Sequence, residues 1–143
     1  MPGNQAARSY ADLRRQEAAA PKVLYAIDGS VTPASPVTKL EPLLAIARAA
    51  VRAGGGHVLD ASHVIFPNGA ITLVLILAES HLSIHTWPEQ DLIAIDLFSC
   101  GAIDGEAVVG ELARELHLAA VSVRRIPRGK QDSGDTQPDG HSL

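Results

Sequence analysis

An almost uninterrupted apolar run, ITLVLILA at Ile71–Ala78, is followed directly by the polar segment ESHLSIHTWPE at Glu79–Glu89. A short apolar run that turn signals bound is consistent with a strand that is covered on both faces. The polar segment brings two serines and two histidines close together, at Ser80, His81, Ser83 and His85. Packing alone rarely needs so many reactive side chains at a strand end. The sequence therefore predicts a buried strand that delivers a cluster of reactive groups.

Hydrophobic periodicity and turn residues divide the whole chain into successive elements. Strands are expected at Lys22–Ile27, His57–Ile65, Ile71–Ala78, His81–Thr86, Leu92–Ser99 and Ala119–Ile126. Helices are expected at Thr38–Ala53, where Thr38 and Glu41 can form a capping box, and from Asp104, as N-cap, to Leu118. This order predicts an α+β fold, a two-layer sandwich with two helices on one face of a mainly antiparallel sheet.

The length of 143 residues predicts a single domain, which we assign to residues 22–126. Residues 1–21 have only a thin apolar face and are expected to form a flexible N-terminal arm. Residues 127–143 are rich in Gly, Pro, Asp and Ser and are expected to form a disordered tail. Basic residues gather near this end and fit a solvated tail better than a binding patch, namely Arg124, Arg125, Arg128 and Lys130.

Charge and cysteine content argue against several classes of protein. The formal net charge of −4 argues against a nucleic-acid partner. The single cysteine, Cys100, excludes an intrachain disulfide. No stretch approaches the roughly 20 apolar residues of a membrane span, and the N-terminus lacks the apolar core of a signal peptide. We therefore expect a cytoplasmic protein with no membrane partner.

The segment Glu79–Glu89 resembles the processing site of the short prokaryotic S-adenosylmethionine decarboxylase proenzymes, and the resemblance covers roughly Val23–Ile126. In that family the chain cuts itself between a glutamate and a serine, and the serine becomes a pyruvoyl group. The corresponding bond here is Glu79–Ser80. The spacing of the family's processing histidine, catalytic cysteine and assisting hydroxyl residue matches His85, Cys100 and Thr72.

The resemblance implies a role for each of these residues. The Ser80 hydroxyl attacks the Glu79 carbonyl to form an ester, with Thr72 assisting, and His85 then removes the Ser80 α-proton so that the chain is cut. Ser80 becomes the pyruvoyl group that carries the Schiff base, and no metal is expected. Cys100 returns a proton to the substrate carbon after carbon dioxide leaves, because an unperturbed thiol is mostly protonated at neutral pH.

The resemblance also implies a substrate and an assembly. Glu89 corresponds to an acid that holds the substrate ribose, Asp28 to an acidic residue after the first strand, and Phe66 lies near a ring that stacks on adenine. The implied activity is decarboxylation of S-adenosylmethionine, which supplies the aminopropyl donor for spermidine synthesis. The implied assembly is a homodimer of cleaved two-chain protomers, with the sites near the interface.

Three alternatives stay open. Family aromatic residues are replaced by Gln90–Leu92 and Gly29, which favours a smaller substrate and hence a pyruvoyl-dependent ornithine or arginine decarboxylase of the same family. The second alternative is a metal-binding protein, whose site would draw on His57, Asp60, His63, His81 and His85. The third is a small structural or binding α/β protein whose histidines are only packed.

One geometric conflict is visible in the sequence. Ser80 and His85 are an odd number of positions apart, so that on a regular strand their side chains face opposite ways. A bulge, a bend or a later strand start would be needed to bring them together. A strained turn at Glu79–Ser80 would also assist self-cleavage. Cys100 is expected at the end of its strand, on the face that also carries Ala94, Asp96 and Phe98.

Overall fold

The structure is a computed structural model, and it describes residues 9, 12, 15, 19–100 and 103–129. Most of the predicted arm and tail lies outside these residues, so both stay predictions. The elements follow one another as β1 (Lys22–Ser30), α3 (Leu40–Ala53), β2 (Val58–Ile65), β3 (Ile71–Leu77), β4 (Ser80–Trp87), the 3-10 helix η1 (Pro88–Gln90), β5 (Leu92–Cys100), α4 (Gly105–Glu115) and β6 (Ala119–Arg128).

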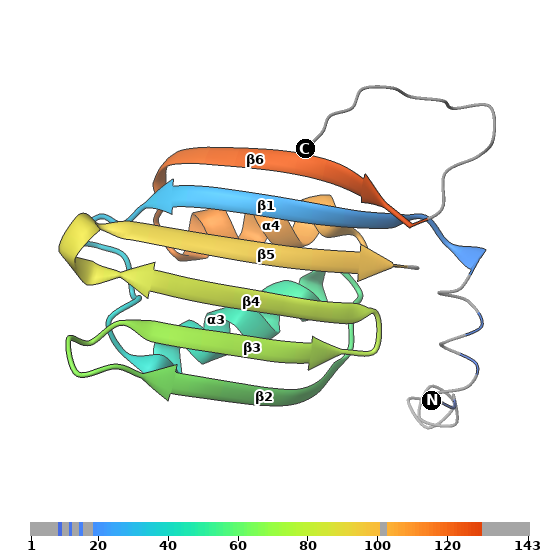
Figure 1. The fold of residues 1–143 in the computed structure, drawn as a ribbon, viewed down its shortest axis with the longest axis horizontal. Helices are drawn as coiled ribbons and strands as arrows, with labels where there is room; N and C mark the ends of the chain where they lie inside the picture. The colour runs from blue at the N-terminus through green and yellow to red at the C-terminus, as the bar shows by residue number, and fades with distance from the viewer. Residues whose placement is uncertain (1–8, 10–11, 13–14, 16–18, 101–102, 130–143) are drawn as a thin grey trace.

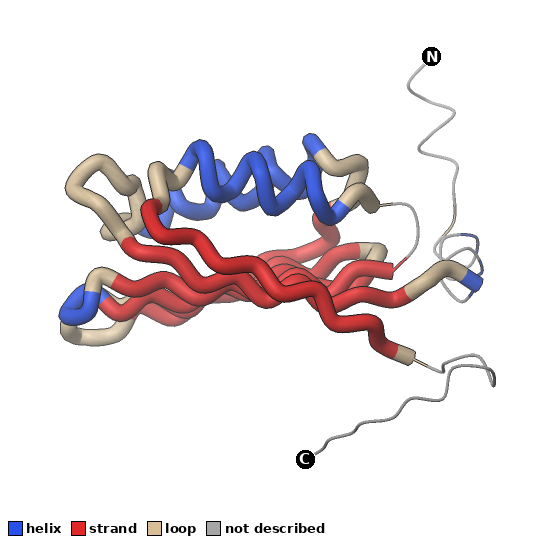
Figure 2. The backbone as a smooth tube through the Cα atoms, turned by 90° about the horizontal axis from the view of Figure 1, so that it is seen from above, coloured by secondary structure: helices blue, strands red, loops and turns tan. Residues whose placement is uncertain are grey.

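A six-stranded sheet in the order β2-β3-β4-β5-β1-β6 forms one layer of the fold. Each pair of neighbouring strands is antiparallel. The two helices α3 and α4 lie side by side and form the second layer, on one face of the sheet (Figures 1 and 2). The predicted α+β two-layer sandwich is therefore confirmed.

The core lies between the helices and the alternate strand residues that face them. Its largest fully buried side chains are aliphatic, as expected for a chain with few aromatic residues, and include Leu43, Ile71, Leu73, Leu75, Leu82, Ile84, Ile93, Ile95 and Leu97. On α3 the buried residues follow the helical period, at Leu43, Ala47, Ala50 and Val51. No described helix is long and apolar enough to cross a membrane.

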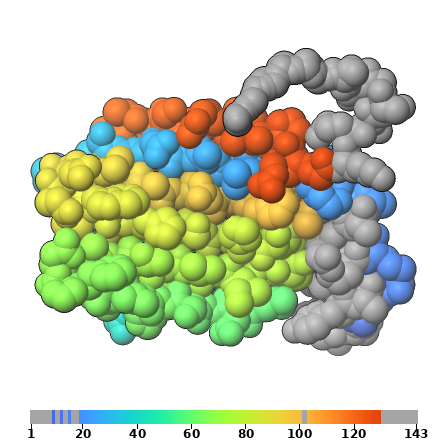
Figure 3. All heavy atoms as spheres, in the orientation of Figure 1, coloured from blue at the N-terminus to red at the C-terminus, as the bar shows by residue number. Residues whose placement is uncertain are grey.

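The other face of the sheet, which we call the open face, is covered by neither α3 nor α4 (Figure 3). Strand register places Asp28, Ala94, His85 and Thr72 in one row across this face. Ile76 of β3 also lies on it and is 46% exposed. The prediction that β3 is covered on both faces is therefore wrong for a single chain, because the helices cover only one layer of its side chains.

Several element ends differ from the sequence predictions. The predicted capping box is wrong, because α3 begins at Leu40 and its N-cap, Lys39, makes no side-chain capping hydrogen bond. β1 continues through Gly29 to Ser30, because its pairing with β5 extends that far. Asp104 caps α4 as predicted, with its carboxylate accepting a hydrogen bond from the Ala107 N–H at 3.1 Å.

Three of the four C-terminal basic residues belong to the sheet. Arg124, Arg125 and Arg128 lie in β6, which pairs with β1, so a solvated tail is the wrong interpretation for them. Arg125 also donates to Glu106 of α4, at 2.6 Å for Nη2 and Oε1. This hydrogen bond lowers the pKa of the Glu106 carboxyl. It also connects the edge strand β6 to the helix α4.

Candidate active site

The Glu79–Ser80 bond lies in a tight hairpin turn between β3 and β4. Leu77 pairs with Ser80, so that only Ala78 and Glu79 form the loop. Such loops usually carry Gly or Asn, because they need a positive φ. Here Ser80 itself takes a φ of 142°. A sparsely populated backbone conformation of this kind costs about 1–3 kcal/mol and is typical of functional sites, so the strained turn expected at this bond is present.

Cys100 holds the carbonyl oxygen of Glu79 with two donors. Its backbone N–H donates at 3.1 Å and its Sγ–H at 3.0 Å. The contact arises because Ser99 pairs with Ser80, which places the end of β5 beside the turn. Two donors on one buried carbonyl oxygen stabilise the oxyanion that forms when a nucleophile attacks that carbonyl. Sequence reasoning considered Cys100 only as a later proton donor and missed this contact.

His57 holds the side chain of the same glutamate. Its backbone N–H donates to Oε1 of Glu79 at 3.0 Å, and its ring Nδ1 lies 2.6 Å from Oε2. The Glu79 side chain is 5% exposed and the His57 side chain 53%. Sequence reasoning placed His57 only in the alternative metal site. The sequence carries no local signal of the pairing between His57 and Glu79, because 22 positions separate the two residues.

A glycine turn between α3 and β2 brings His57 to this place. Gly55 has a φ of 83°, which favours glycine. A Cβ on Gly56 would lie 2.7 Å from side-chain carbons of both Val51 and Ile103. The Gly54 carbonyl oxygen also accepts a hydrogen bond from the Asp104 N–H at 2.8 Å. The turn is therefore packed closely against the segment that leads into α4.

Thr72 and His85 form a second group, away from the scissile bond. They are direct neighbours on β3 and β4, and Thr72 Oγ1 lies 3.3 Å from His85 Nδ1. β4 pairs with both neighbours without a register shift, so His85 lies five residues, or roughly 16 Å, from Ser80. The bulge or bend that would unite them is absent from β4. Within one chain the structure does not bring His85 to the bond that it is predicted to process.

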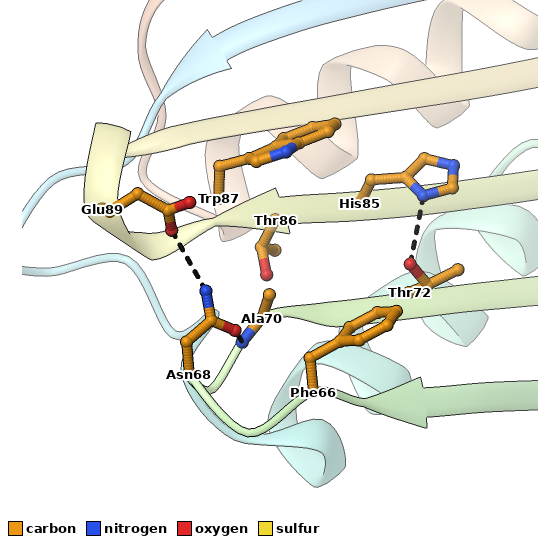
Figure 4. Close-up of a pocket in the computed structure, with 8 residues that line it drawn as sticks. All are labelled: Phe66, Asn68, Ala70, Thr72, His85, Thr86, Trp87 and Glu89. Carbon is orange, nitrogen blue, oxygen red and sulfur yellow. Dashed lines mark hydrogen bonds between the residues drawn. The ribbon is translucent and has the colours of Figure 1, made fainter.

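A hollow of about 350 Å³ lies beside His85 (Figure 4). Its volume falls in the range of small-molecule sites. It brings together four residues that the sequence nominated separately: Phe66, Thr72, His85 and Glu89. The rest of its lining is Asn68, Ala70, Thr86 and Trp87. We call this hollow the His85 pocket.

The β2–β3 turn builds one wall of the His85 pocket. The Phe66 N–H donates to the Ala70 carbonyl at 2.8 Å, and Asn68 Oδ1 accepts from the Ala70 N–H at 3.0 Å. Asn68 Nδ2 then reaches Glu89 Oε1 at 3.4 Å across the pocket. Sequence reasoning recognised this turn but not Asn68 as a pocket residue, because the partner, Glu89, comes from another strand connection.

Asp28 lies near the pocket but does not line it. It is exposed on the open face of β1, and Ala94 of β5 stands between it and His85 in the same row. Two strand spacings put their Cα atoms about 10 Å apart. The structure therefore brings Asp28 into the neighbourhood of His85 without a direct contact.

The histidines in the described part of the chain do not converge on a metal site. His57 pairs with Glu79, His85 with Thr72, and the His81 ring packs edge-on against Phe98 at 5.9 Å between centroids. Among the described residues, no group of three or more His, Cys, Asp or Glu side chains is placed to hold a metal ion. The geometry of this part of the chain gives the metal-binding alternative no support.

Comparison with curated proteins finds several S-adenosylmethionine decarboxylase proenzymes. The chain is similar to S-adenosylmethionine decarboxylase proenzyme 2 of Bacillus anthracis, with 38% identity over 76 residues, 52% of this chain and 62% of the relative. It is 41% identical over 76 residues to the S-adenosylmethionine decarboxylase proenzyme of Clostridium botulinum strain Langeland, covering 52% and 65%. For that of Thermoplasma volcanium the identity is 38% over 95 residues, covering 65% and 72%. The match thus spans less than two thirds of the first two relatives.

A solved structure has the same fold. The crystal structure of the adenosylmethionine decarboxylase from Aquifex aeolicus superposes with a TM-score of 0.70 at 23% identity, covering 82% of this chain and 98% of that one. The sequence model of the family described as S-adenosylmethionine decarboxylase matches residues 24–129, which is most of the chain. The chain therefore belongs to the S-adenosylmethionine decarboxylase family.

Proposed function

We propose that this protein is a self-processing, pyruvoyl-dependent decarboxylase that acts on S-adenosylmethionine. The observation that carries the proposal is the Glu79 carbonyl, held by two Cys100 donors beside the strained backbone of Ser80. A carbonyl in this setting is prepared for attack by the neighbouring hydroxyl. Family membership and the names of the relatives support the same activity.

Processing begins at Ser80. Its Oγ forms a bond to the Glu79 carbonyl carbon, the C–N bond breaks, and the hydroxyl proton passes to the Ser80 nitrogen, which leaves an ester. The Cys100 N–H and Sγ–H hold the negative charge on the carbonyl oxygen while the carbon is tetrahedral. Release of the strained Ser80 backbone favours the same step.

A base then completes the cut. It removes the Ser80 α-proton, the Cβ–Oγ bond breaks, and Glu79 leaves as a carboxylate. Water replaces the nitrogen of the remaining dehydroalanine, ammonia leaves, and residue 80 becomes a pyruvoyl group. We assign the base to His85, since imidazole is partly neutral near pH 7, and Thr72, 3.3 Å from its Nδ1, orients the ring.

The pyruvoyl carbonyl supplies the electron sink that decarboxylation of an amino acid needs. The buried Cys100 thiol lies at the same turn, and we assign it the return of a proton to the substrate carbon. The product for S-adenosylmethionine is the aminopropyl donor for spermidine synthesis.

The His85 pocket supports S-adenosylmethionine as the substrate. Phe66 and Trp87 line it and retain 46% and 37% exposure, so that aromatic surface is available for an adenine ring. Glu89 lies across the pocket from the β2–β3 turn, and its carboxylate can accept two hydrogen bonds from a ribose diol. Ornithine and arginine remain the alternatives, because Glu89 also attracts a distal cation.

We expect release of carbon dioxide from S-adenosylmethionine and no more than background release from ornithine or arginine. The three substrates are assayed side by side with the purified protein. Phe66→Ala should raise the KM for S-adenosylmethionine by roughly 2- to 12-fold, the loss of one aromatic contact. Release from ornithine or arginine alone would overturn the substrate and leave the mechanism intact.

The distance between Ser80 and His85 supports a dimeric site. Both residues are needed for one reaction, yet roughly 16 Å of regular strand separates them within a chain. Consider a dimer in which the two open faces meet and the two-fold axis lies between them, perpendicular to the strands. This axis reverses the strand direction, so that the Ser80 end of one β4 lies opposite the His85 end of the partner's β4. Each site then takes Glu79, Ser80 and Cys100 from one protomer, and Thr72 and His85 from its partner.

The open face has the character of a surface that a second copy covers. It exposes apolar side chains that one helix layer cannot reach, among them Val64, Ile76, Trp87 and Ile126. Exposed apolar surface of this kind marks interaction sites. A face-to-face homodimer therefore explains both the apolar open face and the divided catalytic residues.

Two inactive variants should complement each other in this dimer. Ser80→Ala keeps His85, and His85→Ala keeps Ser80, so we expect the His85→Ala chain to be cut in the heterodimer although neither variant is cut alone. Different affinity tags isolate the heterodimer, and denaturing mass spectrometry measures the cut. The control pairs His85→Ala with the double variant Ser80→Ala/His85→Ala, which supplies no base. An uncut His85→Ala chain in purified heterodimers would contradict the shared site.

A further inference from the structure

The Glu79 side chain is buried but takes no part in the chemistry described above. We propose that His57 is a positioning residue for self-cleavage, which holds the Glu79 carboxylate and thereby fixes the scissile carbonyl on Cys100. This inference rests on the proposed self-processing. It assigns a role in processing to His57 and to the side chain of Glu79, the residue that precedes the cut.

The contacts between the two residues use both oxygens of the carboxylate. The His57 N–H donates to Oε1 at 3.0 Å, and the ring Nδ1 lies 2.6 Å from Oε2. We assign the hydrogen of this contact to Nδ1, because a carboxylate only accepts hydrogen bonds. The backbone of His57 is fixed in turn, since its carbonyl accepts from the Ala78 N–H at 2.9 Å. His57 is therefore hydrogen-bonded to both residues of the two-residue loop, Ala78 and Glu79.

Burial explains why the carboxylate needs this partner. Only 5% of the Glu79 side chain is exposed, and a buried carboxylate without hydrogen-bond partners is strongly disfavoured. Removal of the ring leaves one backbone donor for two oxygens. The side chain then gains by turning toward water, and the Glu79 backbone turns with it.

Such a turn matters because Glu79 is held at both ends. The ring of His57 fixes its side chain, and Cys100 fixes its carbonyl oxygen. Strain at a neighbouring residue persists only where the surroundings over-determine the backbone. With one end free, the Glu79–Ser80 peptide can rotate, relax the φ of 142° at Ser80 and move the carbonyl away from its donors. The Ser80 Oγ–C bond then forms more slowly.

The contribution of His57 ends when the chain is cut. After cleavage Glu79 is the last residue of the first chain and is no longer bonded to residue 80. The His57 ring then holds only the end of the first chain and no longer acts on the backbone of residue 80. Loss of the ring should slow processing and leave the turnover of each pyruvoyl group unchanged, whereas general damage to the fold would lower both.

Two replacements of His57 distinguish the effect of its hydrogen bond to Glu79 from the effect of its side-chain volume. His57→Leu removes the donor and keeps an apolar side chain of similar size. His57→Asn carries an amide N–H at the position of Nδ1, since both nitrogens are bonded to Cγ. His63→Gln serves as a control on β2, the strand that follows His57, because His63 is exposed there. Thermal melts of all variants monitor the fold.

The experiment follows processing of freshly made chains over time and then measures turnover per pyruvoyl group. We expect His57→Leu to process on the order of 10- to 100-fold more slowly, as for one lost charged hydrogen bond, with His57→Asn and His63→Gln close to wild type. We also expect equal turnover per pyruvoyl group in all variants, and little further slowing by His57→Leu in a Glu79→Gln background. Wild-type rates in His57→Leu, or equal slowing in His57→Asn, would overturn the role of His57 alone. An uncut wild-type chain would instead overturn the proposed self-processing.

Discussion

Replacement of Ser80 by alanine should leave the protein as one uncut chain. The Ser80 Oγ is the only atom of the turn that is proposed to attack the Glu79 carbonyl, and alanine offers no substitute. The two Cys100 donors still hold the carbonyl oxygen in this variant, but no nucleophile adds to the carbon. Decarboxylation should fall to background as well, because no pyruvoyl group forms. Denaturing electrophoresis over several days of incubation measures the cut.

A serine on the same strand provides the matched control. Ser83→Ala removes a hydroxyl from β4, three residues beyond Ser80, and should be cut at the wild-type rate. Cleavage of the Ser80→Ala variant directly after Glu79 would show that an external protease makes the cut. Failure of both variants would point instead to damage of β4.

Replacement of Cys100 should separate its two proposed tasks. In Cys100→Ala the backbone N–H still donates to the Glu79 carbonyl but the thiol does not, and loss of one oxyanion donor slows a reaction by about 10²- to 10³-fold. Cys100→Ser keeps a side-chain donor at this position, so its processing should stay much closer to wild type. Both variants should turn over substrate poorly, because a serine hydroxyl is a far weaker acid than a thiol.

The measurement compares the rate of cutting with the carbon dioxide released per pyruvoyl group. Product analysis adds a second readout, since a misdirected proton inactivates the pyruvoyl group by transamination. If Cys100→Ala processes like wild type, the Sγ contact with the Glu79 carbonyl has no role. If it turns over substrate like wild type, another residue is the acid, and His81 is then the next choice.

Most of the fold could be predicted because its signals are local. The apolar run at Ile71–Ala78 and the turn before it fixed β3 almost to the residue, and Asp104 marked the start of α4. The capping box at Thr38 failed because α3 begins at Leu40, so that Lys39 and not Thr38 occupies the N-cap position. The prediction that β3 is covered on both faces failed because the helices of one chain cover only one face of the sheet.

The site was predictable as a set of residues but not as an arrangement. Spacing from Ser80 nominated Thr72, His85 and Cys100, and the pocket gathers Phe66 and Glu89 beside His85. Spacing cannot reveal that β4 is regular and holds His85 far from Ser80. It also cannot reveal the His57–Glu79 contact, which depends on the glycine turn after α3. Contacts between distant positions need the tertiary structure.

The intact mass of the purified wild-type protein tests the central claim most directly. We predict two chains, residues 1–79 and residues 80–143, the second of which begins with a pyruvoyl group. Its mass should lie about 17 Da below that of the same chain with an amino-terminal serine, because the conversion of serine to pyruvoyl amounts to the loss of ammonia, and it should resist Edman sequencing. A single uncut chain after prolonged incubation at neutral pH, or a second chain that begins with an ordinary serine, would contradict the account.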